Sequence, residues 1–374
     1  MTAALPALIL LWERGRPAPI RRQVACAPNP MRAALLTAIG KIHLSDIPPP
    51  RLESPRDVLL KVEAVGVCGS DVHYYRCGGI GAMRVEYPFA LGHECAGRVV
   101  ETGADARQLK PGLRVAIDPL VACGRCDQCQ TGREHTCRSQ KFLGCPGQLS
   151  GALVECLVMP SECCYPVPDS MTAAQAVMVE PFSIALHAQR LARPQSGAKV
   201  AILGAGPIGL CVLAALRAGG DCTIYTTDLV EGRLQMARRL GARWAGNPRS
   251  TDIVRAVAEF EPDGVDFVFE CAGEQQTLDQ GIELLKPGGA MFILGIPEVG
   301  RVSFDIHALR RKEVRIGNVR RQNRCMGEAI DLIAGGAVDL DPLVTHHFPL
   351  ADTAAAFELV AGYRDGVVKA IVDV

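Results

Sequence analysis

The strongest constraint on the fold is a regular alternation of apolar runs and helical patterns in the second half of the chain. Near-continuous apolar strands are buried on both faces, and strands that alternate with helices run parallel. The sequence therefore predicts a parallel sheet wrapped by helices, a doubly wound α/β arrangement. The apolar runs are 200–203, 223–226, 265–269 and 290–294, and the helical patterns are 207–218, 233–240 and 275–285.

A glycine-rich turn, GAGPIG at 204–209, joins the first of these strands to the first helix. The pattern G-x-G-x-x-G is weak alone, but between a strand and a helix it brings backbone N–H groups close to a pyrophosphate. A proline suits the first helical turn, where a missing N–H costs little. An ordinary strand-to-helix turn is the alternative. The predicted dinucleotide contacts are Gly204, Gly206, Pro207, Ile208 and Gly209.

Asp228 follows the second strand of this unit. Its carboxylate is placed to accept hydrogen bonds from the ribose hydroxyls and to repel a 2′-phosphate, which favours NAD over NADP. The alternative is an aspartate that only stabilises a turn. Arg233 stands five residues later, and an arginine so close could tolerate a 2′-phosphate.

Four cysteines form the strongest local motif, with gaps of two, two and seven residues. Two-residue gaps let neighbouring thiolates converge on one ion, and four thiolates favour tetrahedral Zn²⁺ with no open position. An iron–sulfur cluster is a chemical alternative, although no proline follows the fourth cysteine and no second set exists. Four unpaired thiols in a loop are the other. The cysteines are Cys123, Cys126, Cys129 and Cys137.

A second candidate metal set lies upstream and consists of Cys68, His93 and Glu94. One thiolate, one imidazole and one carboxylate make three ligands, the number that a catalytic zinc uses while it leaves a position for water or substrate. A His-Glu dipeptide has no such role in most proteins. The spacing alone therefore does not decide between a metal site and ordinary buried residues.

The first half of the chain has short β-like runs, at 58–62 and 114–117, separated by glycine and proline. This texture predicts an irregular β domain. A length of 374 residues fits two domains at about 100–200 residues each. Residues 1–30 show no periodicity and are predicted to be a disordered extension.

In combination, these motifs resemble the zinc-containing medium-chain alcohol and polyol dehydrogenases, in the family's motif order from about Met31 onward. The resemblance rests on the segment 68–71, on Gly92-His93-Glu94 followed by further glycines, and on the four-cysteine lobe. The segment VEPFSIALHA at 179–188 is similar to the sorbitol dehydrogenase branch, where a Glu-Pro pair replaces a ligand cysteine.

The resemblance implies a GroES-like β-rich catalytic domain at 31–183 and 320–374 and a Rossmann NAD-binding domain at 184–319. It also implies a homodimer or homotetramer. Cys68, His93 and Glu94 would hold a catalytic zinc. Glu180 would hold the zinc-bound water or become a fourth ligand.

Other site residues are assigned by the same resemblance. Ser70 and His73 would relay the alcohol proton; a helix cap and a surface histidine are the alternatives. Arg233 resembles an adenosine-side contact, and a solvated arginine is the alternative. The nicotinamide half would be lined by residues that could instead be plain strand ends. These are Cys271, Leu294, Gly295 and Ile296.

The substrate segment departs from the family pattern. Arg320 matches the family arginine, and Tyr74 matches a substrate-side tyrosine, but Arg321 stands where an aromatic residue is usual. An extra guanidinium could bind a carboxylate or phosphate, or could point to solvent. We expect a sugar alcohol as substrate. The alternatives are an acidic or phosphorylated sugar derivative, an amino alcohol such as threonine, a zinc-scaffolded binding protein and a thiol-based redox sensor.

The composition excludes some classes of binding partner and indicates a cellular compartment. Lys plus Arg and Asp plus Glu both number 40, so nothing attracts nucleic acid or an anionic membrane over a distance. No stretch approaches the about 20 apolar residues of a membrane helix. Sixteen cysteines, five of them assigned to zinc, favour a reducing compartment. The sequence predicts a soluble cytoplasmic protein that acts on a small molecule.

Overall fold

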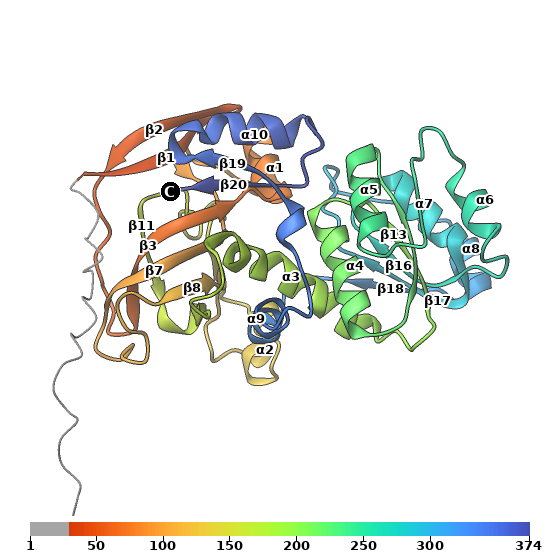
Figure 1. Ribbon diagram of the computed structural model, residues 1–374, viewed down its shortest axis with the longest axis horizontal. Helices are drawn as coiled ribbons and strands as arrows, with labels where there is room; N and C mark the ends of the chain where they lie inside the picture. The colour runs from red at the N-terminus through yellow and green to blue at the C-terminus, as the bar shows by residue number, and fades with distance from the viewer. Residues whose placement is uncertain (1–29) are drawn as a thin grey trace, which may run out of the picture.

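The computed structural model describes residues 30–374 and contains two groups of strands (Figure 1). A β-rich part holds the first half of the chain and its C-terminal strands, and a helix-covered parallel sheet holds 199–318. The extension predicted at 1–30 lies outside the described residues except for its last residue. No helix in the described part is both long and apolar enough to cross a membrane.

The central sheet of the β-rich part has the order β12-β8-β7-β3-β20-β19, and β11 also pairs with β3. Its C-terminal strand β20 runs antiparallel to β3, so residues from opposite ends of the chain meet. Both β-like runs predicted in the first half lie within strands, β3 and β8. The strands are β3 (Asp57–Gly66), β7 (Glu94–Thr102), β8 (Arg114–Ile117), β11 (Cys156–Pro160), β12 (Cys164–Pro166), β19 (Val344–Pro349) and β20 (Lys369–Asp373).

Smaller elements surround this sheet. A three-stranded sheet β2-β1-β6 and two helices share its apolar core. Two short strand pairs, β4 with β5 and β9 with β10, complete the part. These elements are β1 (Met31–Ala38), β2 (Lys41–Ile47), β4 (Gly79–Ile80), β5 (Met83–Arg84), β6 (Phe89–Ala90), β9 (Leu120–Val121), β10 (Lys141–Phe142), α1 (Gly69–Cys77), α2 (Asp127–Gln130) and α10 (Thr353–Ala361).

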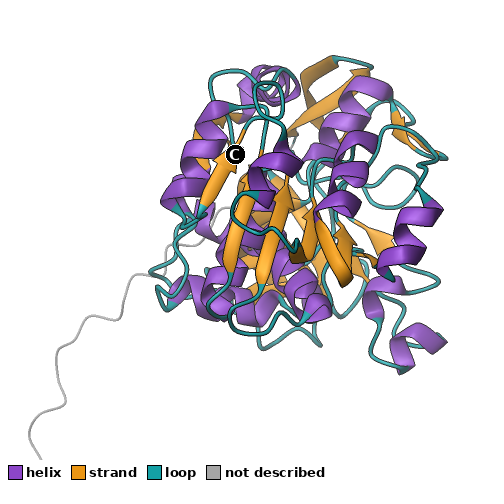
Figure 2. Cartoon of the chain, turned by 90° about the vertical axis from the view of Figure 1, so that its right-hand side faces the viewer, coloured by secondary structure: helices purple, strands orange, loops and turns teal. Residues whose placement is uncertain are grey.

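The second sheet has six parallel strands in the order β15-β14-β13-β16-β17-β18. Numbered along the chain this order is 3-2-1-4-5-6, and helices lie on both faces (Figure 2). The predicted doubly wound sheet is therefore confirmed. The strand order reverses between β13 and β16, where such folds bind ligands. The strands are β13 (Lys199–Leu203), β14 (Thr223–Thr227), β15 (Trp244–Gly246), β16 (Val265–Glu270), β17 (Leu285–Ile293) and β18 (Arg315–Asn318).

The three helices predicted in this unit are present within one or two residues of their expected ends. β17 begins five residues before the predicted apolar run, and β18 was not predicted because its four residues contain no apolar run. The helices are α4 (Pro207–Gly219), α5 (Glu231–Arg239), α6 (Ile253–Ala258), α7 (Gln275–Leu284) and α8 (Ile306–Lys312).

Helix α3 (Ala173–Ala192) lies between the two parts and contacts β3, β7 and β8 on one side and α4 on the other. Thr172 and Gln175 cap its start reciprocally. Sequence reasoning missed this helix, because Pro181 in its middle removes a helical hydrogen bond. α3 also packs on α9 (Met326–Ala334), and it carries Glu180 into the centre of the molecule.

Candidate active site and metal sites

The three predicted catalytic ligands lie together. Cys68 caps the start of α1 just after β3, while His93 and Glu94 stand at the start of β7. Because β3 and β7 pair with Gly66 opposite Glu94, the two strand ends bring the ligands to one place. Their ligand atoms all lie within 4.8 Å of one another. A thiolate, an imidazole and a carboxylate at this separation suit a zinc ion with a fourth position open.

Asp71 orients this cluster, and sequence reasoning gave it no role. Its carboxylate accepts the backbone N–H groups of Cys68 at 3.3 Å and Gly92 at 3.2 Å, and lies 3.4 Å from Nδ1 of His93. This leaves Nε2 of His93 for a metal. Burial would lower the pKa of His93, but the charges of Asp71 and Cys68 raise it well above its usual value.

Lys369 is the second residue that sequence reasoning missed. Its Nζ lies 2.5 Å from Oε2 of Glu94, and both side chains are almost fully buried. A Cβ atom at Gly66 would stand 2.4 Å from the same oxygen, so only glycine leaves room for this carboxylate. Burial would lower the pKa of Lys369, but Glu94 and Cys68 raise it. A lone lysine in the apolar run 367–372 was the available signal.

Glu180 stands beside the cluster on α3 and is buried. The pKa of its carboxyl is raised to about 8, mainly by burial; His93 opposes the rise, and Glu94 contributes to it. Glu180 is therefore close enough to His93 and Glu94 for their charges to act on its carboxyl.

The predicted proton relay begins at Ser70, whose hydroxyl donates to Sγ of Cys68 at 3.4 Å. His73 is partly exposed one turn later on α1, and no hydrogen bond to its ring is found among residues 30–374. Tyr74 is buried, and its hydroxyl lies 3.7 Å from Sγ of Cys145.

Arg321 points inward rather than to solvent. Its guanidinium carbon lies 3.7 Å from the ring centroid of Phe142, and Nη1 donates to Gln140 at 2.8 Å. The Phe142 ring packs in turn against His93, with centroids 5.4 Å apart. Burial and the neighbouring charge of Arg320 lower the pKa of Arg321 to about 10. Arg320 itself is exposed.

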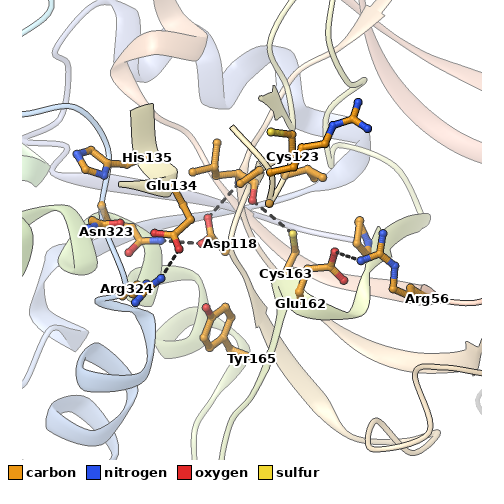
Figure 3. A pocket seen from close by; sticks show the side chains of 17 residues that line it. Arg56, Asp118, Cys123, Glu134, His135, Glu162, Cys163, Tyr165, Asn323 and Arg324 are labelled. Carbon is orange, nitrogen blue, oxygen red and sulfur yellow. Dashed lines mark hydrogen bonds and ion pairs between the residues drawn. The ribbon is translucent and has the colours of Figure 1, made fainter. Parts of the chain in front are cut away.

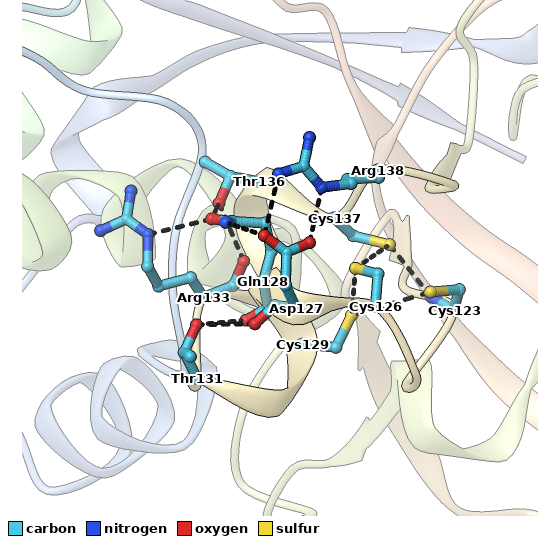
Figure 4. Close-up of polar contacts among 10 residues, drawn as sticks. All are labelled: Cys123, Cys126, Asp127, Gln128, Cys129, Thr131, Arg133, Thr136, Cys137 and Arg138. Atoms are coloured by element: carbon cyan, nitrogen blue, oxygen red, sulfur yellow. Dashed lines mark hydrogen bonds and ion pairs between the residues drawn. The ribbon is translucent and has the colours of Figure 1, made fainter.

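The four cysteines of the lobe converge, with their sulfur atoms facing one another (Figure 4). Three Sγ–Sγ distances are 3.5, 3.8 and 4.0 Å. Tetrahedral zinc with Zn–S bonds of ~2.3 Å separates its sulfurs by ~3.8 Å, so the set fits one ion. Backbone N–H groups of Arg138 and Cys129 lower the pKa of Cys126 to about 6, and Arg138 holds Asp127 through two hydrogen bonds.

The glycine-rich turn opens α4 at the carboxyl end of β13. A Cβ atom at Gly209 would stand 1.9 Å from the carbonyl oxygen of Gly204, so the close packing of helix on turn requires glycine. Gly206 has space beside it, because a Cβ atom at this position would meet only an Arg233 nitrogen, 3.8 Å away. This open cradle at a helix N-terminus suits a pyrophosphate.

Asp228 follows β14 and accepts the N–H of Val230 at 2.8 Å. Burial raises its pKa, and Arg233, 3.9 Å away, opposes the rise. The solvated interpretation of Arg233 is wrong, because this side chain is buried and donates Nε–H to the Val367 carbonyl at 2.9 Å.

The residues predicted for the nicotinamide half follow adjacent strands. Cys271 comes directly after β16, and Leu294, Gly295 and Ile296 come directly after β17. Glu270, which sequence reasoning missed, ties the two ends together. Its carbonyl accepts the N–H groups of Leu294 and Gly295 at 2.8 and 3.0 Å, and its carboxylate accepts N–H groups of the following loop.

Helix α4 begins at the nucleotide cradle and passes close to the metal cluster. Cys211, in the second turn of this helix, is buried close to Glu94, Glu180 and Lys369. Burial raises the pKa of Cys211 to about 12; Lys369 opposes the rise, and Glu94 and Glu180 add to it. One helix therefore links the two sites.

A separate pocket of about 600 Å³ opens beside the four-cysteine lobe (Figure 3). Asp118 lines it and accepts hydrogen bonds from Gln322 at 2.7 Å and Leu120 at 3.0 Å. Burial raises the pKa of Asp118 to about 6. None of the three ligands Cys68, His93 and Glu94 lines this pocket.

Comparisons with known proteins agree with this arrangement. The family model "Alcohol dehydrogenase GroES-like domain" matches residues 54–169, and "Zinc-binding dehydrogenase" matches 207–335. Sorbitol dehydrogenase of Bacillus subtilis is 36% identical over 346 residues, covering 92% of this chain and 98% of that protein. L-idonate 5-dehydrogenase of Vitis vinifera is 33% identical over 336 residues, covering 88% and 91%.

A solved structure shares the whole architecture. An Escherichia coli alcohol dehydrogenase complexed with NADH superposes with a TM-score of 0.84 at 27% identity, covering 92% of this chain and 99% of that one. The expected fold class, a GroES-like domain plus a Rossmann domain, is confirmed.

Proposed function

The chain belongs to the zinc-containing medium-chain dehydrogenase family, and from this premise we propose that it oxidises a secondary alcohol of a sugar alcohol to the ketose with NAD. The observation that carries the proposal is the convergence of Cys68, His93 and Glu94 beside a nucleotide cradle. The donor set leaves one position open, as an alcohol substrate requires. The chain is an enzyme, and its reaction is a hydride transfer.

When bound, zinc would acidify an alcohol hydroxyl and NAD would accept the hydride. The chain's own residues orient the reacting hydroxyl and carry its proton away. Ser70 lies against the ligand sulfur, and the partly exposed His73 stands one turn later on the same helix, so together they would form an exit route for the proton. Glu180, with its raised pKa, would hold the reacting hydroxyl.

Cofactor choice follows from the cradle. Asp228 would bind the ribose hydroxyls, and its charge would repel a 2′-phosphate. Arg233 is drawn toward Asp228 and the Val367 carbonyl, which leaves it less available to a phosphate than a solvated arginine. The residues after β16 and β17 would line the nicotinamide side. We expect a lower KM for NAD than for NADP.

A sugar alcohol is supported by the relatives, whose names include sorbitol dehydrogenase. Tyr74, Arg320 and Arg321 are the proposed substrate-side residues. The test is an NAD-coupled screen of sorbitol, xylitol, an aldonate, a sugar phosphate and threonine. NADH production with the polyols but not with threonine supports the proposal. Activity with threonine alone would contradict it.

A zinc-scaffolded binding protein would share the fold without the reaction. Metal content separates the two possibilities, because the enzyme needs two zinc ions per chain, one for each ligand set. Cys68→Ser should leave one. An unchanged zinc content in this variant, together with no NADH binding, would favour the binding protein.

We also propose the limits of the two domains, the oligomeric state and the cellular location of the chain. Residues 31–183 and 320–374 would form the catalytic domain and 184–319 the NAD domain, with the first junction inside α3. The edge strand β18 and the exposed side chains of Ile296, Val299 and Ile306 support a homodimer or homotetramer. The two sets of metal-ligating thiols would be endangered by an oxidising environment, which supports the cytoplasm.

A further inference from the structure

Arg321 is an uncompensated cation. Of the arginines in residues 30–374, four are buried or half-buried, and we call these sheltered; every other one is exposed. Three of the four pair with an acid: Arg98 and Arg114 with Glu63, and Arg233 with Asp228. Arg321 alone among the sheltered arginines of the described residues has no carboxylate within 4.0 Å. A sheltered charge without a partner is costly, and proteins keep such charges paired or bound to a ligand.

The position of Arg321 is fixed, and part of its donor capacity is free. Stacking on Phe142 and the hydrogen bond to Gln140 hold the guanidinium plane. Only Nη1 is used in that bond, so the remaining N–H donors are available for a bidentate contact. The charges of Glu180 and Asp118 act on Arg321 from a distance, but neither carboxylate lies within ion-pair distance of the guanidinium.

The location assigns the ligand to the substrate side. Phe142 contacts both the guanidinium of Arg321 and the ring of His93, which places the guanidinium near the metal cluster. The pyrophosphate cradle at Gly206 has a different basic neighbour, Arg233. An anion on Arg321 would therefore belong to the molecule whose hydroxyl reaches the cluster.

We propose that Arg321 selects a polyol that carries an anionic group, a carboxylate or a phosphate, on the chain whose secondary alcohol is oxidised. This inference rests on the proposed function and narrows its substrate class. Arg321 is then a specificity residue. A charge-assisted contact of this kind corresponds to a preference of about 10- to 100-fold.

The test compares matched substrates on the zinc-loaded enzyme with saturating NAD: D-gluconate, sorbitol 6-phosphate and D-sorbitol. We expect kcat/KM for at least one anionic substrate to exceed that for D-sorbitol by at least about 10-fold. Arg321→Gln should lower kcat/KM for the preferred anionic substrate by at least about 10-fold more than it lowers kcat/KM for D-sorbitol. Which of the two anions loses rate identifies the carboxylate or the phosphate as the bound group.

The matched control is Arg324→Gln, which removes an exposed guanidinium of the same segment that pairs with Glu134. It should leave the preference unchanged. A second readout is calorimetric binding of D-gluconate and of sorbitol 6-phosphate to the enzyme–NADH complex. Arg321→Gln should weaken the binding of the preferred anion by the same factor as it lowers kcat/KM.

Two results would overturn the inference: equal rates on neutral and anionic polyols in the wild type, or a rise only in the KM for NAD when Arg321 is replaced. If no polyol of either kind reduces NAD, the proposed function fails instead. The calorimetric arm still decides in that case whether Arg321 binds an anion.

Discussion

The two metal sets of this chain are built in opposite ways. The four-cysteine set comes from one short segment, and its supporting contacts, such as Arg138 on Asp127, are local. The Cys68, His93 and Glu94 set joins two strand ends and is completed by Lys369 from the C-terminal strand. A closed local set can only stabilise its lobe, whereas a buried set of distant residues with one open position can act on a substrate.

This difference also explains what the sequence could predict. Spacing alone identified Cys123, Cys126, Cys129 and Cys137, because their geometry is contained in a few residues. For the other set, spacing alone left the question open. The resemblance supplied Cys68, His93 and Glu94, but the charges that surround them depend on strand pairing.

Sequence reasoning missed several residues for the same physical reason: their roles depend on tertiary structure. Asp71 and Lys369 act on ligands through contacts made only after β3, β7 and β20 have paired. Glu270 ties two parallel strands through backbone bonds that no local pattern reveals. Helix α3 was missed because a central proline argues against a helix, while tertiary packing on two sheets stabilises it.

The largest contrast is expected when one cysteine of each set becomes serine. Cys68→Ser should lower NAD-coupled activity by at least about 100-fold, since even loss of a residue that only orients a ligand costs ~10–100-fold. Its melting temperature should change little. Cys126→Ser should instead lower the melting temperature strongly, because a structural zinc contributes directly to folding.

Calorimetric melting and zinc content, measured on both variants, check this contrast. Each should retain one zinc per chain. Unfolding of Cys68→Ser together with an unaltered melting temperature for Cys126→Ser would reverse the two roles.

Lys369→Met tests whether the Cys68, His93 and Glu94 set depends on Lys369, which comes from the C-terminal strand. The change leaves Glu94 buried without its counter-charge, which costs about 3–5 kcal/mol. Chemical denaturation measures the loss, after a chelator has removed the ion from the Cys68, His93 and Glu94 set of both variants and of the wild type. Lys286→Met is a suitable control, because its ion pair with Asp266 is partly exposed and worth about 0–1 kcal/mol. Equal losses in the two variants would contradict the account.

Asp71→Asn tests the orienting role at the same set. Asparagine retains the size but weakens the hold on Nδ1 of His93, so zinc affinity or activity should fall by ~10–100-fold. Competition with a fluorescent chelator measures the affinity. Asp127→Asn, the comparable acid of the four-cysteine lobe, should leave activity unchanged; an activity loss in that variant as well would mean that the two sets are not separable.

The smallest expected effect concerns the contact between the lobe and α3. The rings of His135 and His187 lie 4.9 Å apart, and both ring nitrogens of His187 lack a hydrogen-bond partner within the described residues. Burial, with the charges of His135 and Arg190, lowers the pKa of His187 to about 4. The unfolded chain therefore binds the proton more tightly, and the folded state loses stability as pH falls from about 6.5 toward 4.

His187→Phe removes this loss. Relative to the variant, the wild type should lose about 1 kcal/mol of unfolding free energy between pH 7.5 and pH 5.5. Denaturant titrations at the two pH values measure the difference. A difference that is independent of pH would show that His187 keeps an ordinary pKa in the folded protein.

The central claim is that one zinc serves the reaction and the other serves the lobe. Stepwise removal of zinc by a chelator, with activity and bound zinc measured in the same samples, tests it most directly. Starting from two zinc ions per chain, activity should vanish as the first ion leaves while the melting temperature holds. A fully active protein with one zinc per chain, or full activity after the first ion is lost from a two-zinc protein, would contradict the account.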